Sequence, residues 1–159
     1  MVLCDSPKYI DLHSFSDASQ SAFGSCVYIK TISTNGDVTV QLLCAKSKVA
    51  PLKPTSIPRL ELCAALVATK LTNVVDSYKA IYIIRYKPAR IVCWCDWSVV
   101  LGWIKGDITR LKKFVANRIS EILEHASPLS WRYVPTDLNP ADFISRGVNA
   151  KNIMSLSLW

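Results

Sequence analysis

Four acidic residues of this chain occur in settings where an acid could do chemistry. The sequence contains nine aspartates and three glutamates, and acidic side chains are usually solvated at the surface. Carboxylates that converge in apolar surroundings repel one another and are costly to desolvate unless a cation joins them. Because almost no histidine accompanies these acids, the expected cation is Mg²⁺, which takes oxygen ligands and leaves positions open for a substrate phosphate. The four acids are Asp17 in FSDAS, Glu61 in PRLELCAA, Asp96 in CWCDW and Asp142 in NPADFISRG.

Each of these acids, taken alone, also has an ordinary structural explanation. Asp17 before Ala-Ser could cap a turn, and Glu61 could be an exposed helix residue. Asp96 follows an apolar strand-like run, where a solvated carboxylate is less expected. Asp142 comes two residues after a proline at a helix start, where free backbone amides and the helix dipole favour an acid. Only the set of four therefore predicts a functional site.

The elements that would carry the acids follow from the hydrophobic periodicity. Residues 9–17, 23–31 and 38–47 are predicted strands, and Asn35-Gly36 supplies a tight hairpin between the second and third. Ser56 and Pro58 begin a long amphipathic helix. The remaining predicted elements are a strand over 89–95, helices over 99–105 and 114–124, a strand over 129–134, and a short helix from Asn139-Pro140 to Gly147.

This order predicts an α/β fold with a mixed five-stranded sheet, in which three antiparallel strands are followed by parallel strands and helices flank the sheet. Asp17 would end the first strand and Asp96 the fourth, while Glu61 lies in the early turns of the long helix. If the first and fourth strands are parallel neighbours, both aspartates reach one rim, where open α/β sheets bind ligands. Asp142, at the start of the last helix, would complete the cluster.

Composition predicts one soluble, intracellular domain over residues 1–159, since half of the residues are apolar and the length is typical of a domain. No membrane partner is expected, because no apolar run approaches ~18 residues and the start does not resemble a secretion signal.

The six cysteines lack a CxxC pair, so we expect buried free thiols. His13 and His125 are expected to be structural or surface residues. The net charge of +7 suggests a polyanionic partner.

The four acids and the segments around them resemble the ribonuclease H domain of Pao/BEL-type LTR retrotransposon polyproteins. The resemblance implies a ribonuclease H-like fold and assigns Asp17, Glu61, Asp96 and Asp142 as the catalytic, metal-binding acids. It also implies that the domain is a fragment of a longer polyprotein, between reverse transcriptase and integrase regions, in the cytoplasm, the nucleus or virus-like particles. The matching segments, in the family's order, are FSDASQSAFGSCVY, AKSKVAPLKPTSIPRLELCAAL, DWSVVLGWIKGD, FVANRISEI and WRYVPTDLNPADFISRG.

The activity that this resemblance implies is endonucleolytic cleavage of the RNA strand of an RNA/DNA hybrid during reverse transcription. The four acids would hold two Mg²⁺ ions, for which Mn²⁺ can substitute, and cleavage would leave a 3′-hydroxyl and a 5′-phosphate. Selection of RNA requires a contact to the 2′-hydroxyl, for which Ser16, Ser19 or backbone near Asp17 are candidates. The basic run 105–113 is the candidate phosphate contact, although it could equally be a solvated loop. The candidate nucleic-acid-binding residues are Ser19, Lys105, Arg110, Lys112 and Lys113.

The chain departs from the family's pattern near the acids. Trp97 stands where the family usually has a small hydroxyl residue, Leu111 where it often has Trp, and Tyr133 where it often has His. No histidine lies between Pro135 and Asp142 to assist product release. The alternative function is therefore a catalytically inactive or domesticated domain that binds nucleic acid or supports the polymerase.

Other hydrolytic chemistries lack their motifs in this chain. A proofreading exonuclease needs a second acid where Ser19 stands, and an integrase core normally lacks the helix glutamate. An aspartic peptidase needs an Asp-Thr/Ser-Gly turn, and a Ser-His-Asp hydrolase a GxSxG turn; neither occurs.

Overall fold

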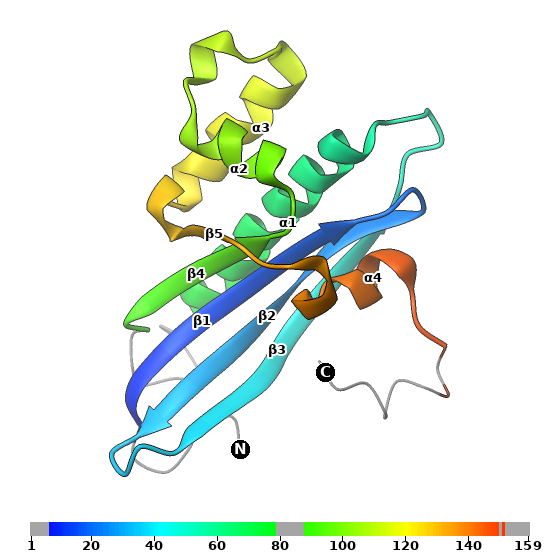
Figure 1. The fold of residues 1–159 in the computed structure, drawn as a ribbon. Coiled ribbons are helices and arrows are strands. Elements are labelled where there is room, and N and C mark those ends of the chain that lie inside the picture. Colours follow the sequence, from blue (N-terminus) through cyan, green and yellow to red (C-terminus); the bar gives the residue numbers. More distant parts are fainter. Residues whose placement is uncertain (1–6, 79–87, 150, 152–159) are drawn as a thin grey trace.

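A central five-stranded sheet organises this computed structural model, which describes residues 7–78, 88–149 and 151 (Figure 1). The strand order is β3-β2-β1-β4-β5. The strands are β1 (Pro7–Ala18), β2 (Ala22–Ser33), β3 (Val38–Val49), β4 (Arg90–Cys95) and β5 (Trp131–Tyr133). The helices are α1 (Ile57–Tyr78), α2 (Ser98–Lys105), α3 (Lys113–His125) and α4 (Asp142–Arg146), with 3₁₀ turns η2 (Ile108–Arg110), η3 (Pro128–Ser130) and η4 (Thr136–Leu138).

The sheet has the predicted mixture of directions. β1, β2 and β3 pair antiparallel, and Gly36 in the β2–β3 hairpin has a φ of 92°, which an L side chain rarely adopts. β4 pairs parallel with β1 and β5 pairs parallel with β4. The predicted α/β fold, with antiparallel strands followed by parallel ones, is therefore confirmed.

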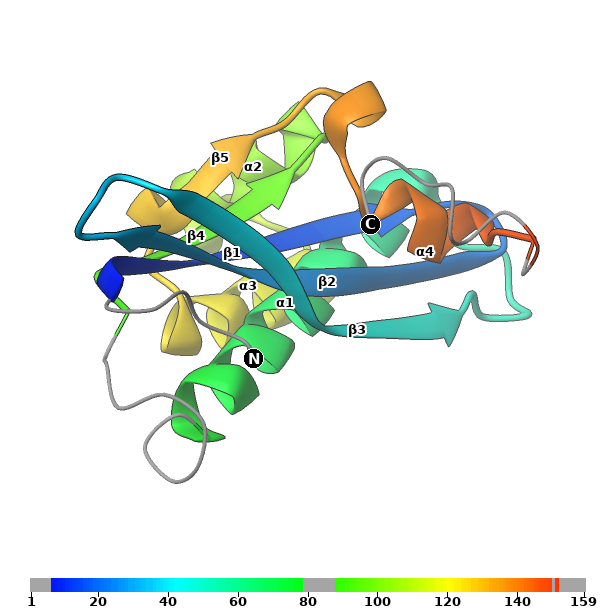
Figure 2. The ribbon, with the colours of Figure 1, turned by 90° about the horizontal axis from the view of Figure 1, so that it is seen from below.

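Side chains of the central strands alternate between two differently covered faces. Ile10 and Leu12 of β1 point to the face under α1, where they form one cluster with Val27 and Ile29 of β2. On the opposite face, Cys26 and Tyr28 pack with Ala141 and with Phe15 and Ile144, beneath α4. A larger core around the fully buried Trp131 joins α1, α2 and α3 to β4 and β5. Figures 1 and 2 show α1 and α4 on opposite sides of the sheet.

Element ends differ from the sequence prediction by a few residues. The strand predicted over 129–134 spans only Trp131–Tyr133. The preceding residues form η3, which begins with Pro128 and is capped by the Ser127 hydroxyl accepting from the Leu129 amide. α4 ends at Arg146, and Gly147, which follows with a φ of 79°, is the predicted glycine stop.

The cysteine prediction is confirmed as to oxidation state and partly as to burial. Within the described residues the thiols are free; three are buried, while Cys44 and Cys63 are half-buried. Cys4 lies outside the described residues. The buried free thiols are Cys26, Cys93 and Cys95.

The two histidines occupy structural and surface positions, as expected. Nδ1 of His13 accepts a hydrogen bond from Nε1 of Trp94 at 3.0 Å, and the two rings stack. His125 ends α3 and is exposed.

In the described part of the chain, no helix combines the length and apolar character needed to cross a membrane.

A close approach at Gly24 lets α4 lie against the sheet. Gly24 pairs with Asp17 across β1 and β2. A Cβ atom at this position would collide with the carbonyl oxygen of Lys46 and with the side chain of Ile144 in α4. The Ser47 hydroxyl also donates to the Ile144 carbonyl oxygen at 3.4 Å. Because Gly24 has no side chain, α4 can lie close to β2 at the position that pairs with Asp17.

We predict that Gly24→Ala lowers the free energy of unfolding by roughly 1–3 kcal/mol, because the added methyl group overpacks the contact between α4 and the sheet. The matched control is Gly102→Ala in the exposed part of α2, where an added Cβ meets no atom within 4 Å. That change should stabilise the protein by roughly 0.5–1 kcal/mol through helix propensity. Urea denaturation of both variants measures the difference, and equal stabilities would contradict the packing role of Gly24.

Candidate active site

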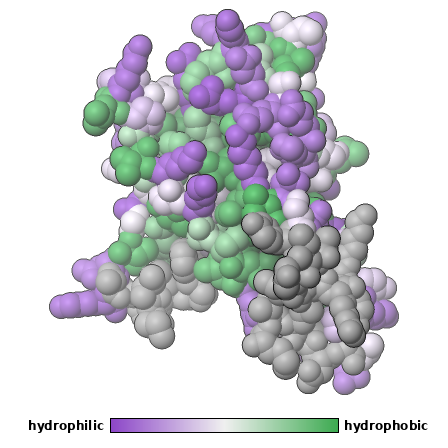
Figure 3. Space-filling view, turned by 180° about the vertical axis from the view of Figure 1, so that it is seen from behind, coloured by the Kyte–Doolittle hydropathy of each residue, from purple (hydrophilic) through white to green (hydrophobic). Residues whose placement is uncertain are grey.

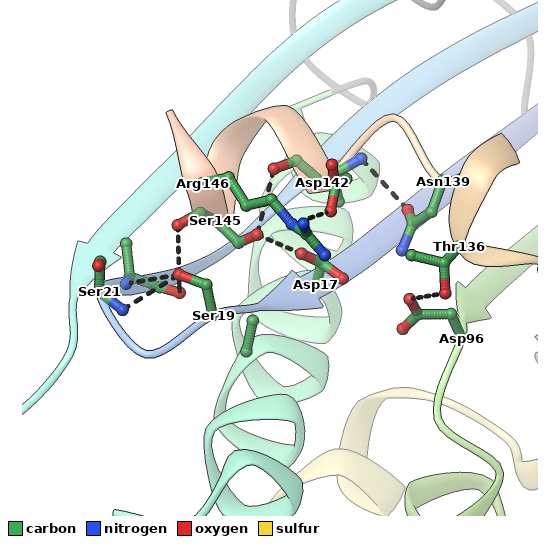
Figure 4. Close-up of polar contacts among 12 residues, drawn as sticks. Asp17, Ser19, Ser21, Asp96, Thr136, Asn139, Asp142, Ser145 and Arg146 are labelled. Carbon is green, nitrogen blue, oxygen red and sulfur yellow. Dashed lines mark hydrogen bonds and ion pairs between the residues drawn. The ribbon is translucent and has the colours of Figure 1, made fainter. Parts of the chain in front are cut away.

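Three of the four predicted acids line one cavity of about 580 Å³. Asp17 comes from the end of β1, Glu61 from the second turn of α1, and Asp96 from the residue after β4. Ser16 of β1 pairs in parallel with Cys95 of β4. Asp17 and Asp96, the residues that follow this pair, therefore lie at the same edge of the sheet. Figure 4 shows Asp17 and Asp96 at the ends of these strands, on the side where α4 begins.

Asp17 is buried and bonded to α4. Its side chain is only 3% exposed, and its Oδ2 accepts a hydrogen bond from the Ser145 hydroxyl (Figure 4). Burial raises the pKa of Asp17 to about 6; the Ser145 hydrogen bond opposes this shift, while the charges of Asp96 and Asp142 add to it and Arg146 opposes it. The carboxyl group therefore lies within a crowded acidic environment.

Glu61 is the most deeply buried of the acids. Its Oε1 accepts from the Ala18 amide at 3.0 Å, whereas its buried Oε2 has no hydrogen-bond partner. Burial, together with the charges of Asp17 and Asp96, raises the pKa of Glu61 to about 9, and the hydrogen bond from the Ala18 amide opposes this shift. Without a cation, Glu61 is therefore protonated at neutral pH.

In the close-up view, Asp142 lies above Asp17, and Asp96 lies to the right of Asp17 (Figure 4). Oδ2 of Asp96 accepts from the Thr136 hydroxyl at 2.9 Å, while its buried Oδ1 has no hydrogen-bond partner. Asp142 begins α4, and its Oδ1 lies 2.6 Å from Nε of Arg146 in an ion pair. Asp142 does not line the cavity, but its charge acts on Asp17. The structure thus brings three acids around the cavity and places the fourth at its margin.

Several residues that orient the acids were missed by the sequence analysis. Thr136 bonds Asp96 and Ser145 bonds Asp17, as described above. Asn139 is 1% exposed; its amide donates to the Ser16 carbonyl oxygen at 3.0 Å, and its Oδ1 accepts from the Ala141 amide at 3.2 Å. It therefore ties the start of α4 to the end of β1. All three lie within WRYVPTDLNPADFISRG, but only the helix-start role of Asn139 was visible there.

The two serines suggested as 2′-hydroxyl contacts have different positions. Ser16 is fully buried and donates to the Trp94 carbonyl oxygen at 3.2 Å, so this suggestion is wrong because the hydroxyl does not reach the cavity. Ser19 does line the cavity. Its hydroxyl donates to the Ser145 carbonyl oxygen at 2.6 Å and accepts from the amides of Ser21 and Ala22. Ser19 thus also holds the β1–β2 turn against α4.

The predicted basic residues lie on the connection between α2 and α3, outside the cavity lining. All four are exposed, and Nε of Arg110 lies 3.5 Å from Oδ2 of Asp107. Seen from behind in Figure 3, this upper end of the molecule is mainly hydrophilic. The residues are Lys105 at the end of α2, Arg110 in η2, and Lys112 and Lys113 at the start of α3.

The three departures from the family's pattern have distinct environments. Trp97 lines the cavity and also packs against the core under α1. Leu111 packs against the same core. Tyr133 is 55% exposed at the end of β5.

The donor set around the cavity fits a hard divalent cation. Asp17, Glu61 and Asp96 supply carboxylate oxygens, and Glu61 Oε2 and Asp96 Oδ1 are buried without hydrogen-bond partners. A cation such as Mg²⁺ would satisfy these oxygens and relieve their mutual repulsion. A sulfur donor also lies nearby: Sγ of Cys95 and one oxygen from each of Glu61 and Asp96 are within 4.8 Å of one another.

We predict that, in the presence of a chelator, the free energy of unfolding falls as pH rises from about 4.5 to about 9. Over this range the folded protein retains the Glu61 proton that the unfolded chain has lost, so higher pH favours unfolding. Glu61→Gln keeps the Oε1 acceptor but cannot ionise, and should be the more stable protein at pH 8 by an amount on the order of 2 kcal/mol. Urea denaturation across this pH range measures the effect.

The control for this experiment is Glu124→Gln, which removes an exposed glutamate from α3. Its pH dependence should match that of the unmodified protein. If Glu61→Gln also follows the unmodified curve, Glu61 is not the group that retains a proton in the folded protein.

Comparison with known proteins identifies a family for the first part of the chain. Residues 2–97 match the model of a family described as "Pao retrotransposon-like RNaseH-like domain". No curated protein matches the sequence. These residues include Asp17, Glu61 and Asp96 but not Asp142.

Solved structures of ribonucleases H share the fold. RNase H1 from Halobacterium salinarum is 12% identical, with a TM-score of 0.50 over 87% of this chain and 95% of that one. LC11-RNase H1 in complex with an RNA/DNA hybrid is 11% identical, with a TM-score of 0.53 over 89% and 97%. An N-terminal RNase H domain from Mycobacterium tuberculosis is 10% identical, with a TM-score of 0.51 over 87% and 91%. At these identities the likeness establishes the ribonuclease H-like fold.

Proposed function

This chain belongs to the Pao retrotransposon-like RNaseH-like domain family, and we propose that it is a Mg²⁺-dependent endonuclease that cleaves the RNA strand of RNA/DNA hybrids during reverse transcription. The observation that supports this proposal is the group of acids around one cavity, with buried carboxylate oxygens that lack partners. Such a group is unfavourable unless a cation binds it. The complex of LC11-RNase H1 with an RNA/DNA hybrid makes the same class of substrate the first to test.

Asp17, Glu61, Asp96 and Asp142 would hold the metal ions, with Mn²⁺ as a substitute for Mg²⁺. Metal ions held there would supply activation of a water molecule and stabilisation of charge on the departing 3′ oxygen. The chain's own contribution is to hold each carboxylate in one orientation. Thr136 does this for Asp96, and the Ala18 amide does it for Glu61.

Ser145 and Arg146 would link α4 to the same site. Ser145 orients Asp17, and Arg146 balances the charge of Asp142 while lining the cavity. Trp97, also in the lining, would meet the nucleic acid beside the acids. The exposed guanidinium of Arg146 can in addition approach a phosphate, since its planar fork matches phosphate oxygens.

The proposed setting is a longer polyprotein in which reverse transcriptase and integrase regions flank this domain. We propose that it acts wherever the element is reverse transcribed, in the cytoplasm, in the nucleus or inside virus-like particles. The basic α2–α3 connection would hold the backbone of the hybrid, since phosphate contacts supply most of such binding.

Cleavage of a labelled RNA/DNA hybrid with Mg²⁺, beside duplex DNA, duplex RNA and single strands, tests the activity directly. We predict that only the RNA strand of the hybrid is cut, and that Asp17→Asn abolishes the cut. Asp17→Asn should also reduce the Mg²⁺-induced rise in melting temperature, because Mg²⁺ stabilises the folded state only as far as it binds there. Without metal, the variant should be at least as stable as the unmodified protein, since a buried charge is gone.

The control is Asp37→Asn, which changes an exposed aspartate in the β2–β3 hairpin. It should cleave the hybrid and respond to Mg²⁺ like the unmodified protein. If Asp17→Asn instead costs about 1 kcal/mol, as loss of a structural cap does, and keeps the full response to Mg²⁺, the catalytic role is contradicted. An inactive, nucleic-acid-binding domain would then be the better account.

We predict that Lys112→Ala combined with Lys113→Ala weakens hybrid binding and reduces the salt dependence by about one unit of log–log slope per lysine. Each lost phosphate contact removes one source of counterion release. Filter binding at several salt concentrations measures the slope, and cleavage at saturating protein should change little.

The charge-matched control is Lys8→Ala combined with Lys30→Ala. Lys8 lies near the start of β1, and Lys30 pairs with Asp11, so both are at the end of the sheet away from Asp17. The control should keep the salt slope of the unmodified protein. Equal slopes for both double variants would remove the α2–α3 connection from the binding surface.

A further inference from the structure

A cysteine thiol lies among the carboxylates of the candidate active site. Cys95 is the last residue of β4 and is fully buried. Its Sγ and one carboxylate oxygen from each of Glu61 and Asp96 lie within 4.8 Å of one another. These donors come from two separate elements, β4 with its following residue and α1, so the fold rather than sequence adjacency brings the glutamate to the thiol.

The Cys95 sulfur is not a typical ligand for Mg²⁺. Mg²⁺ takes oxygen ligands, whereas thiolates select softer ions such as Zn²⁺. Two donor sets therefore overlap at Glu61 and Asp96, which line the cavity, whereas Cys95 lies behind the lining. One consists of carboxylates alone, and the other of a thiol with two of the same carboxylates.

Two observations support an ion site at this mixed set of donors. Glu61 is 0% exposed, lines the cavity and leaves its Oε2 without a hydrogen-bond partner, as does Asp96 with Oδ1. In addition, the backbone amide of Trp97 donates to Sγ of Cys95 at 3.4 Å. A hydrogen bond of this kind stabilises the negative charge of a metal-bound thiolate.

We propose that Cys95, Glu61 and Asp96 form a Zn²⁺ site that competes with Mg²⁺ for the two shared carboxylates. On binding, the thiol gives up its proton to the solvent and sulfur takes the metal in its place, while water fills the open coordination position. Occupation of the site by Zn²⁺ withdraws Glu61 and Asp96 from the magnesium set. The competition rests on the proposed function, whereas Zn²⁺ binding does not.

Cd²⁺, a thiophilic probe, tests the binding through the ultraviolet charge-transfer band of a cadmium thiolate. The full chain should show a saturable band that Cys95→Ser lacks. The control is Cys93→Ser, which changes another buried thiol two residues earlier on the same face of β4 and should retain the band. Glu61→Gln should weaken Cd²⁺ binding by about 10-fold or more, because removing a ligand costs at least as much as removing its outer-shell partner.

A band of undiminished amplitude in Cys95→Ser, or Cd²⁺ affinity unchanged by Glu61→Gln, would overturn the site. Circular dichroism verifies that each variant folds. If Cys95→Ser does not fold, the half-buried Asp96 provides the decisive variant. Weaker Cd²⁺ binding by Asp96→Asn supports the site, and unchanged binding refutes it.

Competition is measured with Zn²⁺ in the hybrid cleavage assay. Zn²⁺ should inhibit the unmodified protein and Cys93→Ser, and excess Mg²⁺ should relieve the inhibition. Cys95→Ser should need about 10-fold more Zn²⁺ for the same effect. Equal inhibition of Cys95→Ser would refute the inference and leave the proposed function intact. A protein that cuts no hybrid, yet shows the Cys95-dependent cadmium band, would refute the proposed function and leave the Zn²⁺ site standing.

Discussion

The parallel pairing of β1 with β4 is the constraint on which the candidate site depends. It runs from Asp11 opposite Arg90 to Ser16 opposite Cys95, so both strands end at the same edge and deliver Asp17 and Asp96 together. α1 crosses the face beneath them and adds Glu61 from below. A different register of one residue would turn one of the aspartates to the opposite face of the sheet. The backbone hydrogen bonds between β1 and β4 thus determine the distance between Asp17 and Asp96, which are far apart in the sequence.

α4 converts this edge into a bounded cavity. Gly24 lets the helix lie close to β2, and Asn139 ties the segment before it to the Ser16 carbonyl oxygen. Ser145 then reaches Asp17, and Arg146 reaches both Asp142 and the cavity. The helix is only five residues long, so its position depends on these side-chain contacts rather than on its own stability. The orientation of Asp17 therefore depends on the packing of α4 against the sheet.

The electrostatic cost of the site is large and local. Burial raises the pKa values of Asp17 and Glu61 to about 6 and about 9, and neighbouring carboxylates add to both shifts. The same burial raises the pKa of the Cys95 thiol to about 12, so without metal it is a neutral neighbour of the acids. A cation that binds these buried carboxyl groups would stabilise their ionised forms, so the site favours cation binding. Which cation it prefers depends on whether oxygen or sulfur supplies the ligands, and both are within reach of Glu61 and Asp96.

Sequence alone determined the order and type of the elements, because periodicity, the Asn35-Gly36 turn and the proline and glycine stops act over a few residues. It also singled out Asp17, Glu61, Asp96 and Asp142, since acids in such surroundings are rare. It could not reveal that Ser145 bonds Asp17 or that Thr136 bonds Asp96, because these partners are 128 and 40 residues apart. The burial of Ser16 and the position of Cys95 beside Glu61 were likewise hidden, since serine and cysteine on a strand look alike whether they face a core or a site. Only the tertiary structure, through strand register and helix docking, decided which polar groups meet.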